Sequence, residues 1–205
     1  MLVSLVRAPP PGLNMEIPMS HILAFAGSAR KESLNRKLVA VAAGGARDAG
    51  AEVTLVDLRD FEMPIFCEDL EAEGGIPESA LQFRELLKAS DGFLIASPEY
   101  NSSFSGLLKN TIDWATRPHE GEKPLECFNG KTAALVAASP GYFGGYRGLQ
   151  QLRYLLGNIG VVVLPEMFSL PGAHEAFAED GSLKDDKQTH RARSVGAALA
   201  HHLSR

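Results

Sequence analysis

Short, mostly apolar runs alternate with segments of helical periodicity along most of this chain. The runs have the length of buried strands and cover residues 22–26, 53–56, 92–96, 132–138 and 161–164. A strand that is apolar at every position is buried on both faces, which is typical of a parallel sheet between two layers of helices. The order of elements therefore predicts an α/β fold: a doubly wound, five-stranded parallel sheet with helices on both faces.

Helical periodicity marks the segments that follow these runs. Ser33 is a favourable N-cap for the first helix, and Gly50 ends that helix. Further helices are expected where apolar residues recur at helical spacing, around residues 81–90, 106–116, 149–156 and 183–203. Residues 57–77 predict a long polar connection with an apolar centre.

The first twenty residues differ from the rest of the chain. Three consecutive prolines at 9–11 interrupt any helix or strand, because proline lacks an amide donor. The apolar stretch 2–6 is short for a signal peptide, and the first basic residue, Arg7, follows it. We interpret residues 1–20 as a flexible N-terminal extension. Residues 21–205 have the length of a single α/β domain.

Charge and cysteine content argue against several classes of protein. A net charge of −5 disfavours a nucleic-acid partner or an anionic membrane surface. No apolar run approaches the roughly 20 residues that cross a bilayer. Cys67 and Cys127 form no Cys-x-x-Cys pair, and the six histidines show no metal-ligand spacing. We therefore expect a reducing, cytoplasmic location and no metal site.

Polar residues follow the first predicted strand, directly before a helix. Ser28, Arg30, Ser33 and Asn35 offer hydroxyl, guanidinium and amide donors there. A helix N-terminus adds free backbone amides and a positive dipole end, so this loop predicts a phosphate site. The alternative is an ordinary capped helix with a solvated Arg30. Neither a Gly-x-Gly-x-x-Gly fingerprint nor a Walker A motif is present.

A second polar loop follows the third predicted strand. It contains Pro98, Glu99, Tyr100 and Asn101. Tyr100 offers a flat aromatic surface, and Asn101 with the backbone amides can bind the polar edge of a planar heterocycle. The alternative is a surface loop with a half-buried tyrosine. In doubly wound sheets ligands bind beyond the carboxyl ends of the strands, where both loops are expected.

Taken together, the two loops carry a family resemblance. The pairing of Gly-Ser-x-Arg-x-x-Ser-x-Asn at 27–35 with Pro-Glu-Tyr-Asn at 98–101 resembles the NADPH-dependent FMN reductases, a flavodoxin-like family that includes quinone, chromate and azo-dye reductases. The segment Leu-Lys-Asn-Thr-Ile-Asp-Trp at 108–114 also matches. The resemblance extends from about residue 21 to the C-terminus. It implies an oxidoreductase domain that binds FMN and uses NADPH or NADH to reduce flavin, quinones or related small-molecule acceptors.

The resemblance also implies which residues hold the cofactor. Those expected at the FMN phosphate are Ser28, Arg30, Ser33, Leu34 and Asn35, and those expected at the isoalloxazine ring are Pro98, Glu99, Tyr100 and Asn101. A third loop would complete the site with Ser139, Gly141, Gly144 and Gly145. The family often has Ser-x-Gly-Gly here, whereas this chain continues with Tyr142 and Phe143, which would narrow the substrate mouth.

The expected mechanism needs no catalytic acid or base, because the flavin carries the hydride chemistry. We expect ping-pong turnover, in which NADPH and the acceptor use one pocket in turn. The family resemblance implies a homodimer or homotetramer. The predicted helix 106–116 also has apolar residues around its circumference, among them Leu107 and Trp114. This favours a second buried face on the helix, such as a subunit contact would provide.

Two other functions compete with this interpretation. A flavodoxin-like electron carrier would bind FMN without turning over a small substrate, but such carriers usually have a strongly acidic face. The segment 137–141 approximates the nucleophile elbow of a serine esterase around Ser139. An esterase would need an acid and a histidine downstream, such as Asp180 and His190.

Overall fold

The computed structural model describes residues 19–205. A single five-stranded sheet of order β2-β1-β3-β4-β5 forms its centre, and every neighbouring pair is parallel. The strands are β1 (His21–Ala26), β2 (Glu52–Asp57), β3 (Gly92–Ala96), β4 (Thr132–Ala138) and β5 (Val162–Leu170). The predicted α/β fold is confirmed. This strand order is the flavodoxin-like one, with its switch point between β1 and β3.

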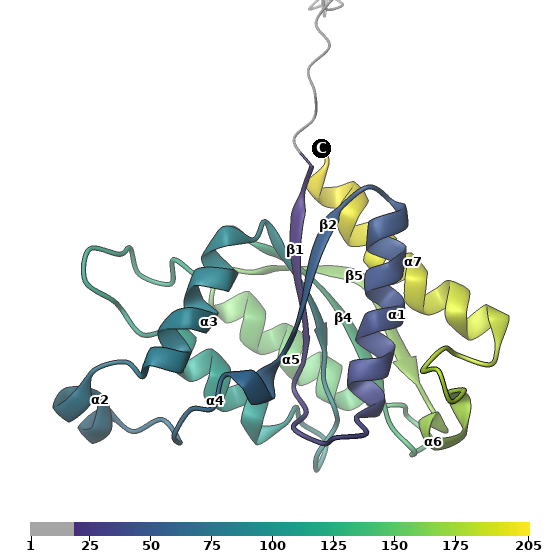
Figure 1. Ribbon diagram of the computed structural model, residues 1–205, viewed down its shortest axis with the longest axis horizontal. Helices are drawn as coiled ribbons and strands as arrows, with labels where there is room; N and C mark the ends of the chain where they lie inside the picture. The colour runs from purple at the N-terminus through teal and green to yellow at the C-terminus, as the bar shows by residue number, and fades with distance from the viewer. Residues whose placement is uncertain (1–18) are drawn as a thin grey trace, which may run out of the picture.

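Helices cover both faces of the sheet, as the apolar strands require (Figure 1). On one face lie α1 (Leu34–Asp48) and α7 (Asp186–Leu203), and on the other lie α3 (Glu78–Ala89), α4 (Gly106–Ala115) and α5 (Tyr146–Asn158). Three short elements complete the fold: the 3-10 helix η1 (Leu58–Asp60), α2 (Glu68–Gly74) and α6 (Ala173–Ala176).

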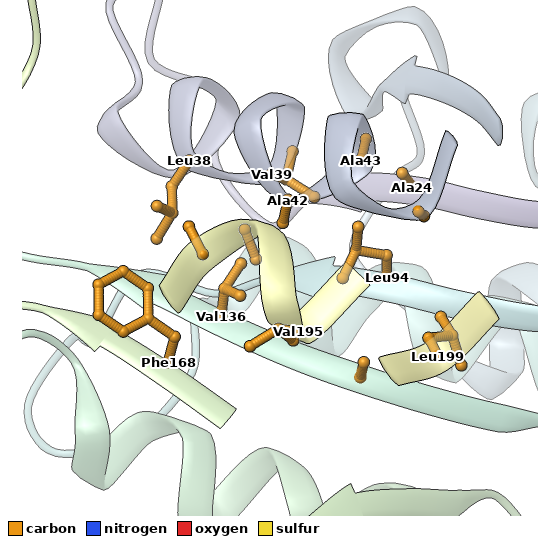
Figure 2. Packing of buried hydrophobic residues seen from close by; sticks show 14 of the residues in the cluster. Ala24, Leu38, Val39, Ala42, Ala43, Leu94, Val136, Phe168, Val195 and Leu199 are labelled. Carbon is orange, nitrogen blue, oxygen red and sulfur yellow. The ribbon is translucent and has the colours of Figure 1, made fainter. Parts of the chain in front are cut away.

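Each strand contributes to two hydrophobic cores, one on either side of the sheet. In β1, Ile22 and Ala24 join the core under α1 and α7, whereas Leu23 and Phe25 join the core under α3, α4 and α5. This alternation follows the two-residue period of a strand. Figure 2 shows the first core, in which small side chains from α1 meet Val195 and Leu199 from α7.

Two glycines allow α1 and α7 to approach closely. A Cβ atom on Gly45 would lie 2.0 Å from the carbonyl oxygen of Arg193, and one on Gly196 would lie 2.0 Å from that of Ala42. Both neighbours are backbone atoms that cannot rotate away. The contact between the two helices therefore depends on the missing side chains, and it holds α1 in place over the sheet.

Strand β5 is longer than the predicted 161–164. Its register against β4 shifts between Ala133 and Leu135, where β5 advances from Val163 to Met167. Pro165 lies in this bulge. An edge strand tolerates a proline at a bulge because no ladder hydrogen bond is lost there. Pro165 interrupts the apolar pattern in the sequence, so the predicted strand stops before it, although β5 continues to Leu170.

The other corrections concern short helices and one helix start. The predicted connection 57–77 contains η1 and α2, and α6 was also missed, because none of these reaches the length at which periodicity is informative. Leu183 does not begin the last helix. It pairs with Phe177 in an isolated bridge, and α7 begins at Asp186 after its N-cap Asp185.

The second apolar face of α4 is covered by the chain itself. The buried Trp114 donates from Nε1 to the carbonyl oxygen of Pro64 at 2.8 Å, and the Phe66 ring lies edge-on at 5.0 Å between centroids. Asn110 holds the same segment by accepting from the Phe66 amide at 2.7 Å. The observation that favoured a subunit contact on this helix thus has an intramolecular explanation, and the dimer or tetramer stays a prediction.

The predicted N-terminal extension, residues 1–20, overlaps the described residues only at Met19 and Ser20. Residues 1–18 of the predicted extension lie outside the described residues. Ser20 is buried, and its carbonyl oxygen accepts from the Glu52 amide at 2.9 Å, so the sheet begins to pair one residue before β1. Between residues 19 and 205, no helix combines the length and the apolar composition that a membrane span requires.

Replacing Gly196 with alanine tests the helix contact. The added Cβ would force α7 away from Ala42, and we expect the free energy of unfolding to fall by about 1–3 kcal/mol in urea denaturation. Gly74→Ala is the matched control, because nothing lies within 4 Å of its Cβ position. That variant should be neutral or slightly stabilised. Equal stability of the two variants would show that the contact between α1 and α7 does not depend on Gly196.

Candidate functional site

Three loops meet at the carboxyl ends of β1, β3 and β4, at the lower edge of the sheet in Figure 1. They enclose a pocket of about 70 Å³ next to the switch point. Its lining residues are Ser28, Arg30, Ser33, Leu34, Asn35, Pro98, Glu99, Tyr100, Ala138, Ser139 and Pro140. All of these except Ala138 and Pro140 were predicted as site residues. The structure therefore brings together side chains that lie far apart in the sequence.

The first loop places the N-terminus of α1 at this pocket. Ser33 is the N-cap, and its Oγ accepts from the Arg36 amide at 3.2 Å. The amides at the start of a helix have no partner within the helix. The first turn of α1 contains no acidic residue, so no side chain in that turn offsets the positive end of the helix dipole. An anion in the pocket would meet this end directly.

Arg30 is the free cation of the pocket. Its side chain is exposed, and within residues 19–205 it takes part in no ion pair, whereas Arg36 pairs with Asp57 and Arg147 pairs with Glu99. Its own amide donates to Ser28 Oγ at 3.4 Å, which holds the backbone of the loop. The guanidinium is thus available for an anion.

Asn35 has a role that sequence reasoning missed. Its Nδ2 donates to the carbonyl oxygen of Ala138 at 2.9 Å, and its Oδ1 accepts from the amide of Ala138 at 2.9 Å. Both residues are buried. This pair of hydrogen bonds joins the start of α1 to the end of β4. Asn35 lines the pocket, but it uses its amide chiefly to position the first and third loops.

The second loop turns sharply after Tyr100. The Tyr100 amide donates to the Ser103 carbonyl at 2.8 Å, and the Ser103 amide donates back at 3.1 Å. Between them, Asn101 and Ser102 have φ values of 51° and 68°, the signature of a type I′ turn. Asparagine accepts this conformation readily. The turn leaves the Tyr100 side chain 51% exposed beside the pocket, and Asn101 lies at the tip, outside the lining.

Glu99 fastens the second loop to α5. Its Oε1 accepts from Arg147 Nε at 2.8 Å, and its Oε2 accepts from the Gly148 amide at 3.1 Å. The carboxylate thereby caps the first turn of α5 and faces the positive end of that helix. Both oxygens are occupied and the side chain is only 7% exposed, so Glu99 positions the loop.

The third loop follows β4 and contains the predicted glycines. The Ser139 amide donates to the Leu170 carbonyl at 3.1 Å, and Ser139 Oγ accepts from the Gly141 amide at 3.2 Å. Gly144 and Gly145 are buried with φ values of 61° and 94°. Their Cβ positions would lie 2.7 Å from the backbone of Leu170 and 2.6 Å from the Cβ of Ala137. These two glycines lie outside the pocket lining and allow the loop to pack on the sheet.

A family comparison agrees with this arrangement. The model of the NADPH-dependent FMN reductases matches residues 20–175. The chain belongs to this family. As a member, it is an NAD(P)H-dependent oxidoreductase with FMN as its cofactor, which decides between the enzyme and the electron carrier in favour of the enzyme.

Individual relatives support the same assignment. An NAD(P)H-dependent FMN reductase of Pseudomonas aeruginosa is 39% identical over 81% of this chain and 85% of its own length. An NAD(P)H:quinone oxidoreductase of Solanum tuberosum is 36% identical over 89% of this chain and 92% of its own length. Among solved structures, the flavoenzyme NAD(P)H:acceptor oxidoreductase FerB of Paracoccus denitrificans is 32% identical, with a TM-score of 0.73 over 90% of this chain and 97% of FerB.

The reductase also has a larger hollow of about 550 Å³ between α1, β2 and the turn at 180–182. The charge of Arg36 is balanced there by Asp57, with 2.9 Å between Arg36 Nη1 and Asp57 Oδ2, although within residues 19–205 this nitrogen makes no hydrogen bond. Burial alone would raise the pKa of Asp57, but hydrogen bonds from Arg59 and the charges of Arg36 and Arg59 lower it. Asp57 therefore stays ionised and holds Arg36, which makes this hollow a poorer anion site than the pocket with Arg30.

The esterase alternative finds no support in the reductase. His190 lines a separate hollow with Asp48 and Arg193, and Asp180 accepts hydrogen bonds from Ser182. Neither residue lines the pocket of Ser139. Because a nucleophilic serine needs a base within hydrogen-bond reach, Ser139 lacks the partners proposed for it.

Replacing Asn35 with alanine tests its positioning role. The change leaves the buried amide and carbonyl of Ala138 without partners, and we expect it to lower the free energy of unfolding by about 1–3 kcal/mol in urea denaturation. Asn158→Ala serves as the control, since Asn158 is exposed near the end of α5 and should change stability by less than about 0.5 kcal/mol. Similar values for both variants would contradict the role assigned to Asn35.

Proposed function

We propose that the pocket binds FMN with its phosphate at the N-terminus of α1. The position of Arg30 beside the first turn of α1 carries this proposal: within residues 19–205 Arg30 forms no ion pair, and that turn contains no acidic residue. A cation and free backbone amides thus lie together. Ser28 and Ser33 accept backbone hydrogen bonds through Oγ, so each hydroxyl still has its proton to donate. These groups match the chemistry of a phosphate dianion.

The small size of the pocket supports a position for the rest of the cofactor over the loops above it. A volume of about 70 Å³ suits a compact group such as a phosphate and is too small for a three-ring system. The ring therefore belongs over the outer loops, where Tyr100 is half exposed and Pro98 and Ser139 border the pocket. Asn101 and Gly141 lie at the rim, where their backbones can approach the ring.

The proposed reaction is the reduction of a quinone or flavin by NAD(P)H. For a quinone, NAD(P)H gives up a hydride and becomes NAD(P)⁺, and the quinone takes up that hydride with a proton from solvent to become a hydroquinone, so two electrons are transferred. FMN supplies the chemistry by accepting and then donating a hydride. The side chains of the pocket hold the cofactor and expose its ring. A quinone acceptor is supported by the names of the relatives from Solanum tuberosum and Pseudomonas putida.

In this proposal the ring of bound FMN is open to solvent on one face, where donor and acceptor bind in turn. Steady-state rates with varied NADPH and varied quinone should then give parallel double-reciprocal lines, the pattern of ping-pong turnover. Intersecting lines would show that both substrates bind together, and the shared site would be wrong.

Replacing Arg30 with alanine separates phosphate binding from ring binding. Loss of the charge-assisted contact should weaken FMN binding about ten- to a hundredfold, measured by fluorescence quenching during titration of the apoprotein. Riboflavin lacks the phosphate and should bind the variant and the original protein about equally.

Lys31→Ala is the matched control, because Lys31 is the neighbouring exposed cation and does not line the pocket. The FMN affinity of the Lys31→Ala variant should differ from that of the original protein by less than about threefold. If riboflavin binding fell as far as FMN binding in Arg30→Ala, Arg30 would not be a phosphate ligand.

A further inference from the structure

The third loop exposes two consecutive aromatic side chains next to the proposed FMN pocket. Tyr142 is 88% exposed and Phe143 is 53% exposed, directly after Ser139, Pro140 and Gly141. The resemblance to the family leads one to expect a small residue here. The two exposed rings form an apolar surface beside the pocket that a planar ligand can cover.

The two rings are held in place by contacts that lead to the pocket wall. Tyr142 and Phe143 meet edge-on, with centroids 5.4 Å apart and an interplanar angle of 83°. The guanidinium of Arg147 lies 5.0 Å from the centroid of Phe143, and Arg147 Nε donates to Glu99 at 2.8 Å. Because Glu99 lines the pocket, the aromatic pair is connected through Arg147 to a residue of the pocket.

The electrostatics of this surface favour a neutral, planar ligand. Arg147 is neutralised by Glu99, so the surface presents aromatic rings without a free cation. The phosphates of a dinucleotide would find no partner on it, whereas an uncharged ring would gain aromatic contact and lose little hydration.

We propose that Tyr142 and Phe143 form the acceptor-binding wall of this reductase and select acceptors with an extended aromatic face. The proposal rests on the proposed function, because it assumes that FMN occupies the adjacent pocket. A two-ring quinone can contact this wall with its second ring. A compact inorganic acceptor such as ferricyanide has no aromatic face and gains nothing from it.

The test compares two acceptors in the FMN-loaded protein at saturating NADPH. We expect the ratio of kcat/KM for 1,4-naphthoquinone to that for ferricyanide to fall about three- to tenfold in Tyr142→Ala and in Phe143→Leu. Tyr142→Phe keeps the ring and should hold the ratio within about twofold. Tyr154→Ala is the control, since Tyr154 is 71% exposed on α5 away from the pocket lining and should leave both acceptors unchanged.

Several results would overturn the proposal. An unchanged ratio in Tyr142→Ala and Phe143→Leu would show that the rings do not contact the acceptor. Loss of bound FMN, or a change of mass in sedimentation, would assign the rings to cofactor retention or to a subunit contact instead. Failure of the original protein to hold FMN or oxidise NADPH with either acceptor would refute the proposed function itself, and the acceptor wall with it.

Discussion

Two hydrogen bonds between the side chain of Asn35 and the backbone of Ala138 connect the first turn of α1 to the end of β4. The first and third loops approach each other because of this buried connection. Glu99 performs the equivalent task for the second loop, by holding it to the first turn of α5. The pocket is thus assembled by side chains that bind backbone groups, and the exposed Arg30 beside it forms no ion pair within residues 19–205.

The sheet and its helices determine where this pocket can form. Parallel strands direct all their carboxyl ends to one edge, and the change of direction between β1 and β3 opens a crevice there. The close approach of α1 and α7 through Gly45 and Gly196 fixes α1 over the sheet, so that its N-terminus points at the crevice. The positive end of α1 therefore faces the pocket for reasons of packing as well as of local sequence.

Much of the fold could be predicted from local pattern, because the central strands β1, β3 and β4 are almost entirely apolar and the long helices have clear periodicity. The short helices α2 and α6 could not be predicted, since neither is long enough for periodicity to be informative. The bulge at Pro165 could not be predicted either, because it depends on the register of β5 against β4. At the site, the loop motifs indicated most lining residues. The pairing of Asn35 with Ala138 and the packing roles of Gly144 and Gly145 join residues from different loops, which no local pattern reveals.

A crystal structure of the FMN complex is the most direct test of the proposed cofactor site. We predict that the phosphate lies within hydrogen-bond distance of the Leu34 and Asn35 amides and of the Arg30 guanidinium, with the ring over Tyr100. A phosphate bound instead in the larger hollow beside β2, near Arg36 and Ser182, would contradict the assignment of the FMN site.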